Sequence, residues 1–222
     1  MIPSASSPEV FGVLDGAGIR QWLRTLPSGI APWIEKYIRV EQYEEGDLIA
    51  EEKAPQTEIY IINKGAVKLT RTKADGSWQI LHFAGPGDIF GLSSLATDNP
   101  RPYNLVAHTS SETGVLSKTV VQAAIEKEPS LYFHLMQKLN GLINDLDQQR
   151  AWMLPGATQK NLVHIVLNLK KKFGTEKNGW IRLNLPATDL ANYLGVSRTH
   201  LYYILGRQKE AIEYRNGFLR LK

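Results

Sequence analysis

Residues 185–207, LPATDLANYLGVSRTHLYYILGR, constrain this chain more than any other stretch. Apolar residues recur in the first half at helical spacing, and Gly195 then ends a helix because glycine adopts the left-handed conformation without a Cβ clash. Ser197 is a favourable N-cap for a second helix. The apolar residues of that second helix share one face: Leu201, Ile204 and Leu205. The stretch therefore predicts two short helices joined by a tight turn.

The other faces of the second helix carry polar, basic and aromatic side chains: Ser197, Arg198, Thr199, His200, Tyr202 and Tyr203. Such a helix fits the major groove of DNA, where arginine binds guanine or phosphate. A helix pair with a solvated outer face explains the same spacing, but the charge favours DNA. Residues 157–222 hold 12 Lys and Arg against 4 Asp and Glu, whereas residues 1–156 are acidic as a whole. We therefore interpret the stretch as a helix-turn-helix and these six residues as candidate DNA contacts.

The composition excludes several classes of function. The chain has no cysteine, which excludes disulfides, thiolate-held iron–sulfur clusters and cysteine nucleophiles. No apolar run approaches the ~18 residues of a membrane span, and the first ten residues lack the pattern of a secretory signal. We expect no membrane contact, no metal site and no catalytic residues, and DNA binding requires the cytoplasm or nucleoid.

Between residues 38 and 128 the pattern changes to short alternating or apolar runs separated by glycine-containing turns. Strands of this length with regular turn signals predict a small antiparallel sandwich or jelly roll. The expected strands are residues 59–62, 67–72, 78–83, 105–108 and 114–116. Asp75-Gly76 is the clearest hairpin turn. Two amphipathic helical pieces, around residues 19–26 and 30–38, precede the strands.

A long helix is expected from about Ser130 to Met153. Its apolar residues follow spacings of four and three, with Gln149 at one intervening position: Leu135, Leu139, Leu142, Leu146 and Met153. This heptad pattern is typical of a coiled coil, and a parallel dimer suits a palindromic DNA site. We therefore predict a dimer seam along these residues; a helix packed only on its own domain is the alternative.

Beyond that helix, Pro155-Gly156 predicts a hinge. A helix over residues 158–173 ends in three lysines, 170–172, which would contact phosphate or form a solvated helix end. A strand over residues 180–185 and a terminal hairpin with an Asn216-Gly217 turn complete a winged helix-turn-helix. The sequence thus predicts an α+β fold in four segments: a helical segment (1–37), a β-roll sensor domain (38–128), a dimerisation helix (129–155) and a winged helix-turn-helix domain (156–222).

In this order the segments resemble the CRP/FNR superfamily of bacterial transcription regulators. The most specific stretches are IYIINKGAVKL (59–69), PGDIFGLSSL (86–95) and DLANYLGVSRTHLYYIL (189–205). The resemblance implies a cyclic-nucleotide-binding-like β-roll, also described as a double-stranded β-helix, and a homodimer without enzymatic activity. It further implies a palindromic operator in double-stranded DNA and RNA polymerase as a further partner.

The resemblance also locates an effector pocket, at Gly91, Leu92, Ser93, Arg101 and Pro102. In cAMP-binding relatives a Glu follows the Phe-Gly turn, and an Arg-Ser pair binds the cyclic phosphate. Here Leu92 replaces that Glu, and Pro102, which has neither a hydroxyl nor an N–H, replaces the Ser. We expect no tight cAMP binding, no cofactor and an effector of unknown identity; a constitutive regulator with an empty pocket stays open. Arg101 serves either another anion or a structural ion pair.

The second helix of the pair departs from the Arg-Glu…Arg pattern of the best-known members, since Thr199 takes the place of Glu and Tyr203 that of the second Arg. Glutamate reads cytosine, so its loss predicts a different operator. We expect Gly206 to end this helix early. His82 or His108 could hold a haem, although ordinary hydrogen bonding explains each. Two further functions stay open: a sensor acting through protein partners, and a cupin-like metal enzyme.

Overall fold

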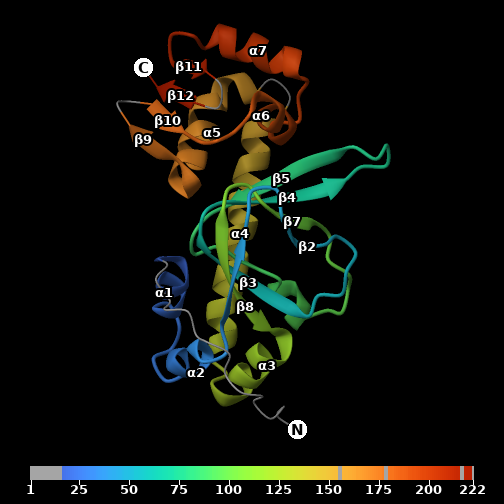
Figure 1. Ribbon diagram of the computed structural model, residues 1–222, viewed down its shortest axis with the longest axis vertical. Coiled ribbons are helices and arrows are strands. Elements are labelled where there is room, and N and C mark those ends of the chain that lie inside the picture. The colour runs from blue at the N-terminus through green and yellow to red at the C-terminus, as the bar shows by residue number, and fades with distance from the viewer. Residues whose placement is uncertain (1–16, 155–156, 178–179, 216–217, 222) are drawn as a thin grey trace.

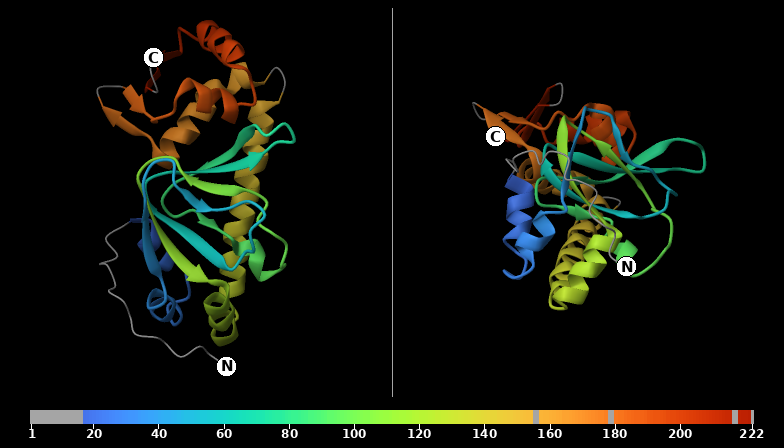
Figure 2. Two further views of the ribbon diagram at one scale, coloured as in Figure 1. Left: turned by 45° about the vertical axis from the view of Figure 1, so that its right-hand side comes forward. Right: turned by 60° about the horizontal axis from the view of Figure 1, so that its bottom comes forward.

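The computed structural model describes residues 17–154, 157–177, 180–215 and 218–221. In Figure 1 the β-roll occupies the middle of the molecule, the C-terminal domain lies above it, and one long helix, α4 (Leu131–Met153), runs along most of the length. The left view of Figure 2 shows the middle of α4 beside the β-roll and its C-terminal end beside the C-terminal domain. The sensor and DNA-binding segments expected from the sequence are therefore joined by a helix that also packs on the sensor.

Residues 39–117, all of which the structure describes, form the β-roll from two four-stranded antiparallel sheets. The strand orders are β1-β8-β3-β6 and β2-β7-β4-β5. The strands are β1 Arg39–Tyr43, β2 Leu48–Ala50, β3 Glu58–Lys64, β4 Val67–Thr72, β5 Trp78–Ala84, β6 Ile89–Phe90, β7 Asn104–Ala107 and β8 Ser111–Ser117. The core between the sheets is formed by aliphatic residues together with Tyr60 and Phe90, because alternate side chains of each strand point to one face.

Short helices close one side of the β-roll: α1 Ala17–Leu23, α2 Ala31–Glu35, the 3₁₀ helix η1 Leu92–Leu95 and α3 Lys118–Lys127. Together with the start of α4 (Leu131–Met153) they enclose a second apolar core around Trp22, Ile59 and Leu116. This core lies on the outer face of the sheet, so the β-roll is covered by helices from both ends of its sequence.

The C-terminal domain consists of three helices and a small antiparallel sheet of order β11-β12-β10-β9, counted over the described ranges. Its elements are α5 Thr158–Phe173, β9 Thr175–Lys177, β10 Trp180–Arg182, α6 Ala187–Tyr193, α7 Arg198–Arg207, β11 Ile212–Arg215 and β12 Phe218–Leu221. Their apolar faces form a third core, which also includes Ile80 and Phe83 of β5. The domain is therefore packed on the β-roll as well as connected to it.

The expected fold class, an α+β chain with an N-terminal jelly roll, is confirmed. The helix over 158–173 and the strand over 67–72 have the expected bounds, whereas β1, β2 and β6 were missed because each is very short or lacks a clear alternation. The strand expected over 180–185 ends at Arg182. The early end at Gly206 is wrong, since α7 continues to Arg207. The first ten residues, Pro155-Gly156 and Asn216-Gly217 lie outside the described residues.

Candidate DNA-binding helix, sensor pocket and domain junction

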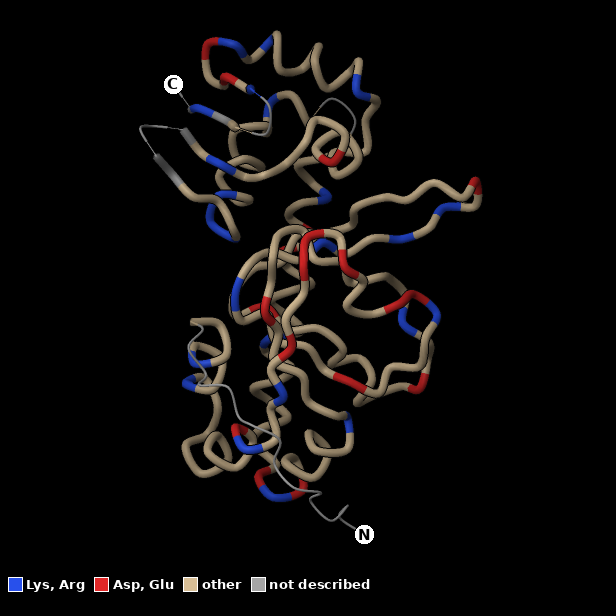
Figure 3. Tube along the Cα trace, in the orientation of Figure 1, with Lys and Arg blue, Asp and Glu red and all other residues tan. Residues whose placement is uncertain are grey.

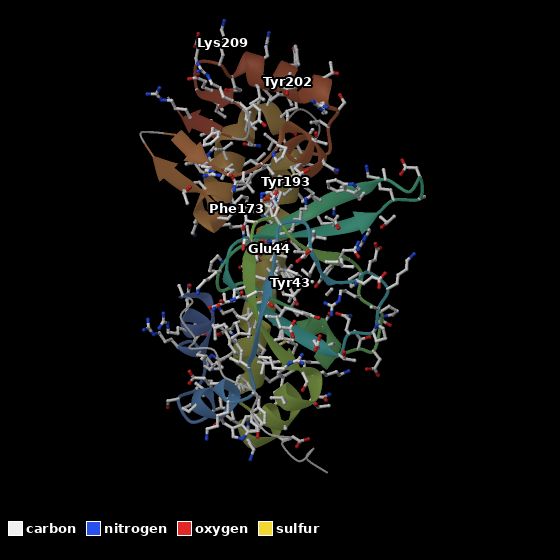
Figure 4. The ribbon with its side chains drawn as sticks, in the orientation of Figure 1. Tyr43, Glu44, Phe173, Tyr193, Tyr202 and Lys209 are labelled. Carbon is white, nitrogen blue, oxygen red and sulfur yellow. The ribbon has the colours of Figure 1, made fainter. Side chains whose placement is uncertain are left out.

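The helix-turn-helix has the local geometry that its sequence predicts. Gly195 adopts a φ of +67° directly after α6, and the Ser197 Oγ accepts a hydrogen bond of 3.1 Å from the backbone N–H of His200. Leu201, Ile204 and Leu205 are buried in the third core. The candidate DNA contacts all lie on the exposed side of the turn and of α7: Ser197, Arg198, Thr199, His200, Tyr202 and Tyr203. Figure 4 shows Tyr202 on the outer side of α7, away from the β-roll.

The expected effector pocket is only partly assembled as predicted. Arg101 is 3% exposed, and its guanidinium lies 5.2 Å from the centre of the Tyr60 ring. Within the described residues, no hydrogen-bond partner meets its Nη1 and no carboxylate forms an ion pair with it. A structural ion pair, one of the two roles expected for Arg101, is therefore not formed here. Burial raises the pKa of the Tyr103 hydroxyl, whereas the Arg101 charge and a hydrogen bond with the Gly91 backbone lower it. Tyr103, Arg101 and Gly91 therefore lie together.

The structure corrects the position expected for Leu92, which does not lie in the pocket. Its side chain is buried in the second core with Ile59 and Leu116, on the helical side of the sheet, because an apolar side chain gains more from that core than from a polar pocket. Ser93 donates a hydrogen bond of 3.1 Å to Gln56 Oε1 within the chain, and Pro102 is exposed. Of the five expected pocket residues, Arg101 and Gly91 are those that share a site.

The junction between the domains contains a partly buried polar cluster that sequence analysis missed. Lys172 Nζ of α5 lies 3.2 Å from Asp145 Oδ2 of α4 and 3.5 Å from Asp88 Oδ2 beside β6. It also lies 3.5 Å from His82 Nε2, while His82 Nδ1 is 3.1 Å from Gln149 Oε1. Burial, followed by the Lys172 charge, lowers the pKa of His82 to about 4. The sequence suggested that Lys172 contacts phosphate or belongs to a solvated helix end. Its ion pairs with Asp145 and Asp88 instead place it at the domain junction.

Further contacts hold the C-terminal domain against the β-roll. The Phe83 ring of β5 lies 5.0 Å from Tyr193 and 5.3 Å from Phe173, measured between ring centres, and Figure 4 shows both partners where the two domains meet. Lys68 of β4 forms an ion pair of 3.0 Å with Asp189 of α6. A Cβ at Gly85 would overlap the carbonyl oxygen of Lys172, so glycine permits the close approach of the two backbones.

The predicted dimer seam of α4 requires correction. Leu135 is buried in the second core, Leu142 packs against the core between the sheets, and Met153 packs against the third core. These side chains are covered by their own chain because one face of α4 lies against the β-roll. A neighbouring heptad stripe of α4 is exposed or partly exposed: Tyr132, Met136, Leu139, Ile143, Leu146 and Arg150. The two stripes share Leu139 and Leu146, which is why the sequence pattern alone could not separate them.

Within the described ranges, no helix combines the length and apolar character needed to cross a membrane. In the same part of the chain, no three His, Asp or Glu side chains gather in a group able to hold a metal ion. His108, one of the two histidines considered for haem, directs Nε2 toward the Leu183 carbonyl oxygen at 3.3 Å.

Comparison with known proteins finds a domain match for the β-roll and relatives over most of the chain. Residues 40–128 match the model of the cyclic nucleotide-binding domain. A CRP-like cAMP-activated global transcriptional regulator of Mycobacterium tuberculosis (strain ATCC 25618 / H37Rv) is 28% identical over 192 residues, which cover 84% of this chain and 83% of the relative. A global nitrogen regulator of Synechococcus elongatus is 27% identical over 192 residues, covering 85% and 84% of the two chains.

Solved structures share the fold. A c-di-GMP responsive global regulator of Xanthomonas campestris superposes with a TM-score of 0.73 at 16% identity, covering 88% of this chain and 99% of that one. A CRP/FNR family transcriptional regulator of Thermus thermophilus gives a TM-score of 0.70 at 20% identity, covering 83% and 93%. Over most of its length the chain is therefore similar to transcription regulators, and its residues 40–128 match the model of the cyclic nucleotide-binding domain.

Proposed function

We propose that this chain is a homodimeric, sequence-specific DNA-binding transcription regulator whose β-roll does not respond to cAMP. The observation that carries the proposal is α7, a capped helix with a buried apolar back and an exposed front that begins at Arg198. Figure 3 supports it, because Lys and Arg recur around the C-terminal domain whereas Asp and Glu gather along the β-roll. A basic domain that presents an open helix favours contact with a phosphate backbone.

Dimerisation is supported by the exposed stripe of α4. Its residues follow heptad spacing, and Ile143 lies at its centre with about half of its side chain exposed. A second copy of α4 would cover this apolar surface and place two copies of α7 in the same dimer. Two recognition helices about 34 Å apart would read half-sites one DNA turn apart, and hence a palindromic operator.

The lack of a cAMP response follows from two positions of the β-roll. Leu92 is packed into a core on the other side of the sheet, and Pro102 offers no donor beside Arg101. The buried guanidinium with an unmatched Nη1 instead favours a different anionic effector. The proposal requires no metal, haem or iron–sulfur cluster, and it implies action in the cytoplasm with RNA polymerase as a further partner.

The Arg198→Ala variant tests DNA binding. We expect specific binding to weaken by about 1–3 kcal/mol, because arginine supplies a base or phosphate contact. Titration of a labelled duplex by fluorescence anisotropy measures the affinity. Arg24→Ala, which removes the same charge from the distant turn after α1, is the matched control and should bind like the wild type. Equal affinities of the two variants would contradict the role of α7.

The Ile143→Asp variant tests the dimer. A charge in the middle of the stripe should yield monomers in sedimentation velocity, because a buried unpaired carboxylate opposes association. Asn144→Asp places the same charge one residue further along the helix, off the stripe, and should remain dimeric. A dimeric Ile143→Asp variant would show that the seam lies elsewhere.

A further inference from the structure

The centre of the exposed face of α7 carries no charge. Since successive helical residues are turned by roughly 100°, the line opposite the buried Leu201, Ile204 and Leu205 passes through Thr199, Tyr203 and Gly206. Arginines stand only at the two ends of the helix, and no acidic residue occurs between Arg198 and Arg207. A groove-reading helix of this kind offers a hydroxyl and an aromatic ring at its centre, and no acceptor for the cytosine amino group.

Tyr203 is held in place by its neighbour on the preceding turn. The rings of His200 and Tyr203 are stacked, with 5.8 Å between their centres and 23° between their planes. The backbone N–H of His200 donates to Ser197 Oγ, which places His200 in the first turn of the helix. Tyr203 remains 56% exposed, and apart from the chain neighbours and the backbone of the helix itself no atom lies within 4 Å of the place where a Cβ on Gly206 would stand. The Tyr203 ring is therefore stacked against His200, and open space lies one turn further along the helix.

We propose that Tyr203 determines the operator sequence by packing its ring on the 5-methyl group of a thymine in each half-site, and that His200 is the residue that positions it. The inference rests on the proposed function. Thymine is the base that offers an apolar group in the major groove, and an uncharged ring at the centre of α7 complements it. A ring already ordered by stacking loses little side-chain freedom on binding, so the contact adds to specificity.

The experiment removes the methyl group from DNA without altering hydrogen bonding. The full-length dimer is titrated with its best-bound duplex from a random pool, and then with duplexes in which each thymine in turn is replaced by deoxyuracil. We expect one position in each half-site at which the replacement weakens binding about fourfold, the effect of exposing one buried methyl group. Tyr203→Ala should bind the thymine and deoxyuracil duplexes equally at that position.

Matched variants separate the ring from other causes. Tyr202→Ala, which removes a similarly exposed ring from the adjacent position, should keep the deoxyuracil penalty. Tyr203→Phe should also keep it, because the ring and not the hydroxyl makes the contact. His200→Ala should reduce the penalty and His200→Phe should restore it, as expected for a stacking role and not for a hydrogen bond.

The outcomes distinguish this inference from the function on which it rests. A wild-type dimer that selects a duplex but shows no deoxyuracil penalty, or a penalty that persists in Tyr203→Ala, overturns the inference and leaves the regulator intact. A wild-type protein that selects no duplex overturns both.

Discussion

The β-roll and the domain junction each bury a cation, Arg101 in the first and Lys172 in the second. Lys172 lies between the carboxylates of Asp88 and Asp145, which come from different elements. Arg101 faces the Tyr60 ring, and its Nη1 has no hydrogen-bond partner in the described part of the chain. A buried charge is costly unless it is paired, so the two cations have different consequences for folding.

The two sites therefore differ in how the cation is matched. The ion pairs of Lys172 join α5 of the C-terminal domain to α4 and to the loop before β6. Arg101 lies against Tyr60 and Tyr103 inside the β-roll, and its Nη1 is unmatched within the described residues. An anion bound there would satisfy the guanidinium, and the β-roll would gain stability from that ligand and not from its own carboxylates.

The largest effect is expected for Lys172→Met. It leaves two aspartates without their partner, and because their side chains are 37% and 46% exposed, water offsets part of the loss. We expect the free energy of unfolding to fall by about 1–3 kcal/mol in urea titrations. Lys171→Met, which changes the adjacent exposed lysine, should have little effect. Equal stability of the two variants would mean that the junction cluster does not hold the domain.

A smaller effect is expected from the pH dependence of the same cluster. Burial lowers the pKa of His82 to about 4 from an ordinary value of 6.5. Between these two values His82 is protonated in the unfolded chain and neutral in the folded chain. The contribution of His82 is fully present above pH 6.5 and is lost as the pH falls toward 4. Between about pH 7 and pH 5.5 the free energy of unfolding, measured by urea titration, should fall by about 1 kcal/mol more in the wild type than in His82→Gln.

His108 contributes in the same direction, because burial also lowers its pKa. The fall in the free energy of unfolding with pH that remains in His82→Gln is therefore due to His108 and other groups. Identical pH profiles for the wild type and His82→Gln would show that His82 is not held neutral at the junction.

The smallest effect is expected for Arg101→Met. Replacing an unpaired buried cation by an apolar side chain of similar length should change the free energy of unfolding by less than about 1 kcal/mol. The contrast with Lys172→Met, measured in the same urea titration, is the quantity of interest. A loss as large as that of Lys172→Met would show that Arg101 has a structural partner and is not available to an anion.

The helices α7 and α4 show what the sequence could predict and what it could not. For α7 the cap, the glycine turn and the buried face depend on residues within one or two turns, so local chemistry was sufficient. For α4 the heptad residues fall into two overlapping stripes, and only the packed β-roll determines that Leu135 is covered by its own chain. Lys172 was misjudged for the same reason, since Asp145 and Asp88 lie 27 and 84 residues away from it.

The pocket shows a further limit of prediction from sequence. The sequence predicted Leu92 in the pocket because it comes directly after the Phe-Gly turn. Its side chain instead packs in the core beneath the helices, because burial of an apolar side chain is favourable there. The position was predicted correctly, and the direction of the side chain was not. Arg101 could be located from its motif, but its lack of a partner depends on every neighbouring strand.

The proposed function requires a dimer of this chain that reads a DNA sequence through α7. We would test it by selecting bound duplexes from a random pool with the purified full-length protein. We expect enrichment of a palindrome whose half-sites are centred about one helical turn apart, roughly 10 base pairs. Recovery of unenriched DNA, bound only weakly and lost as salt is raised, would contradict it.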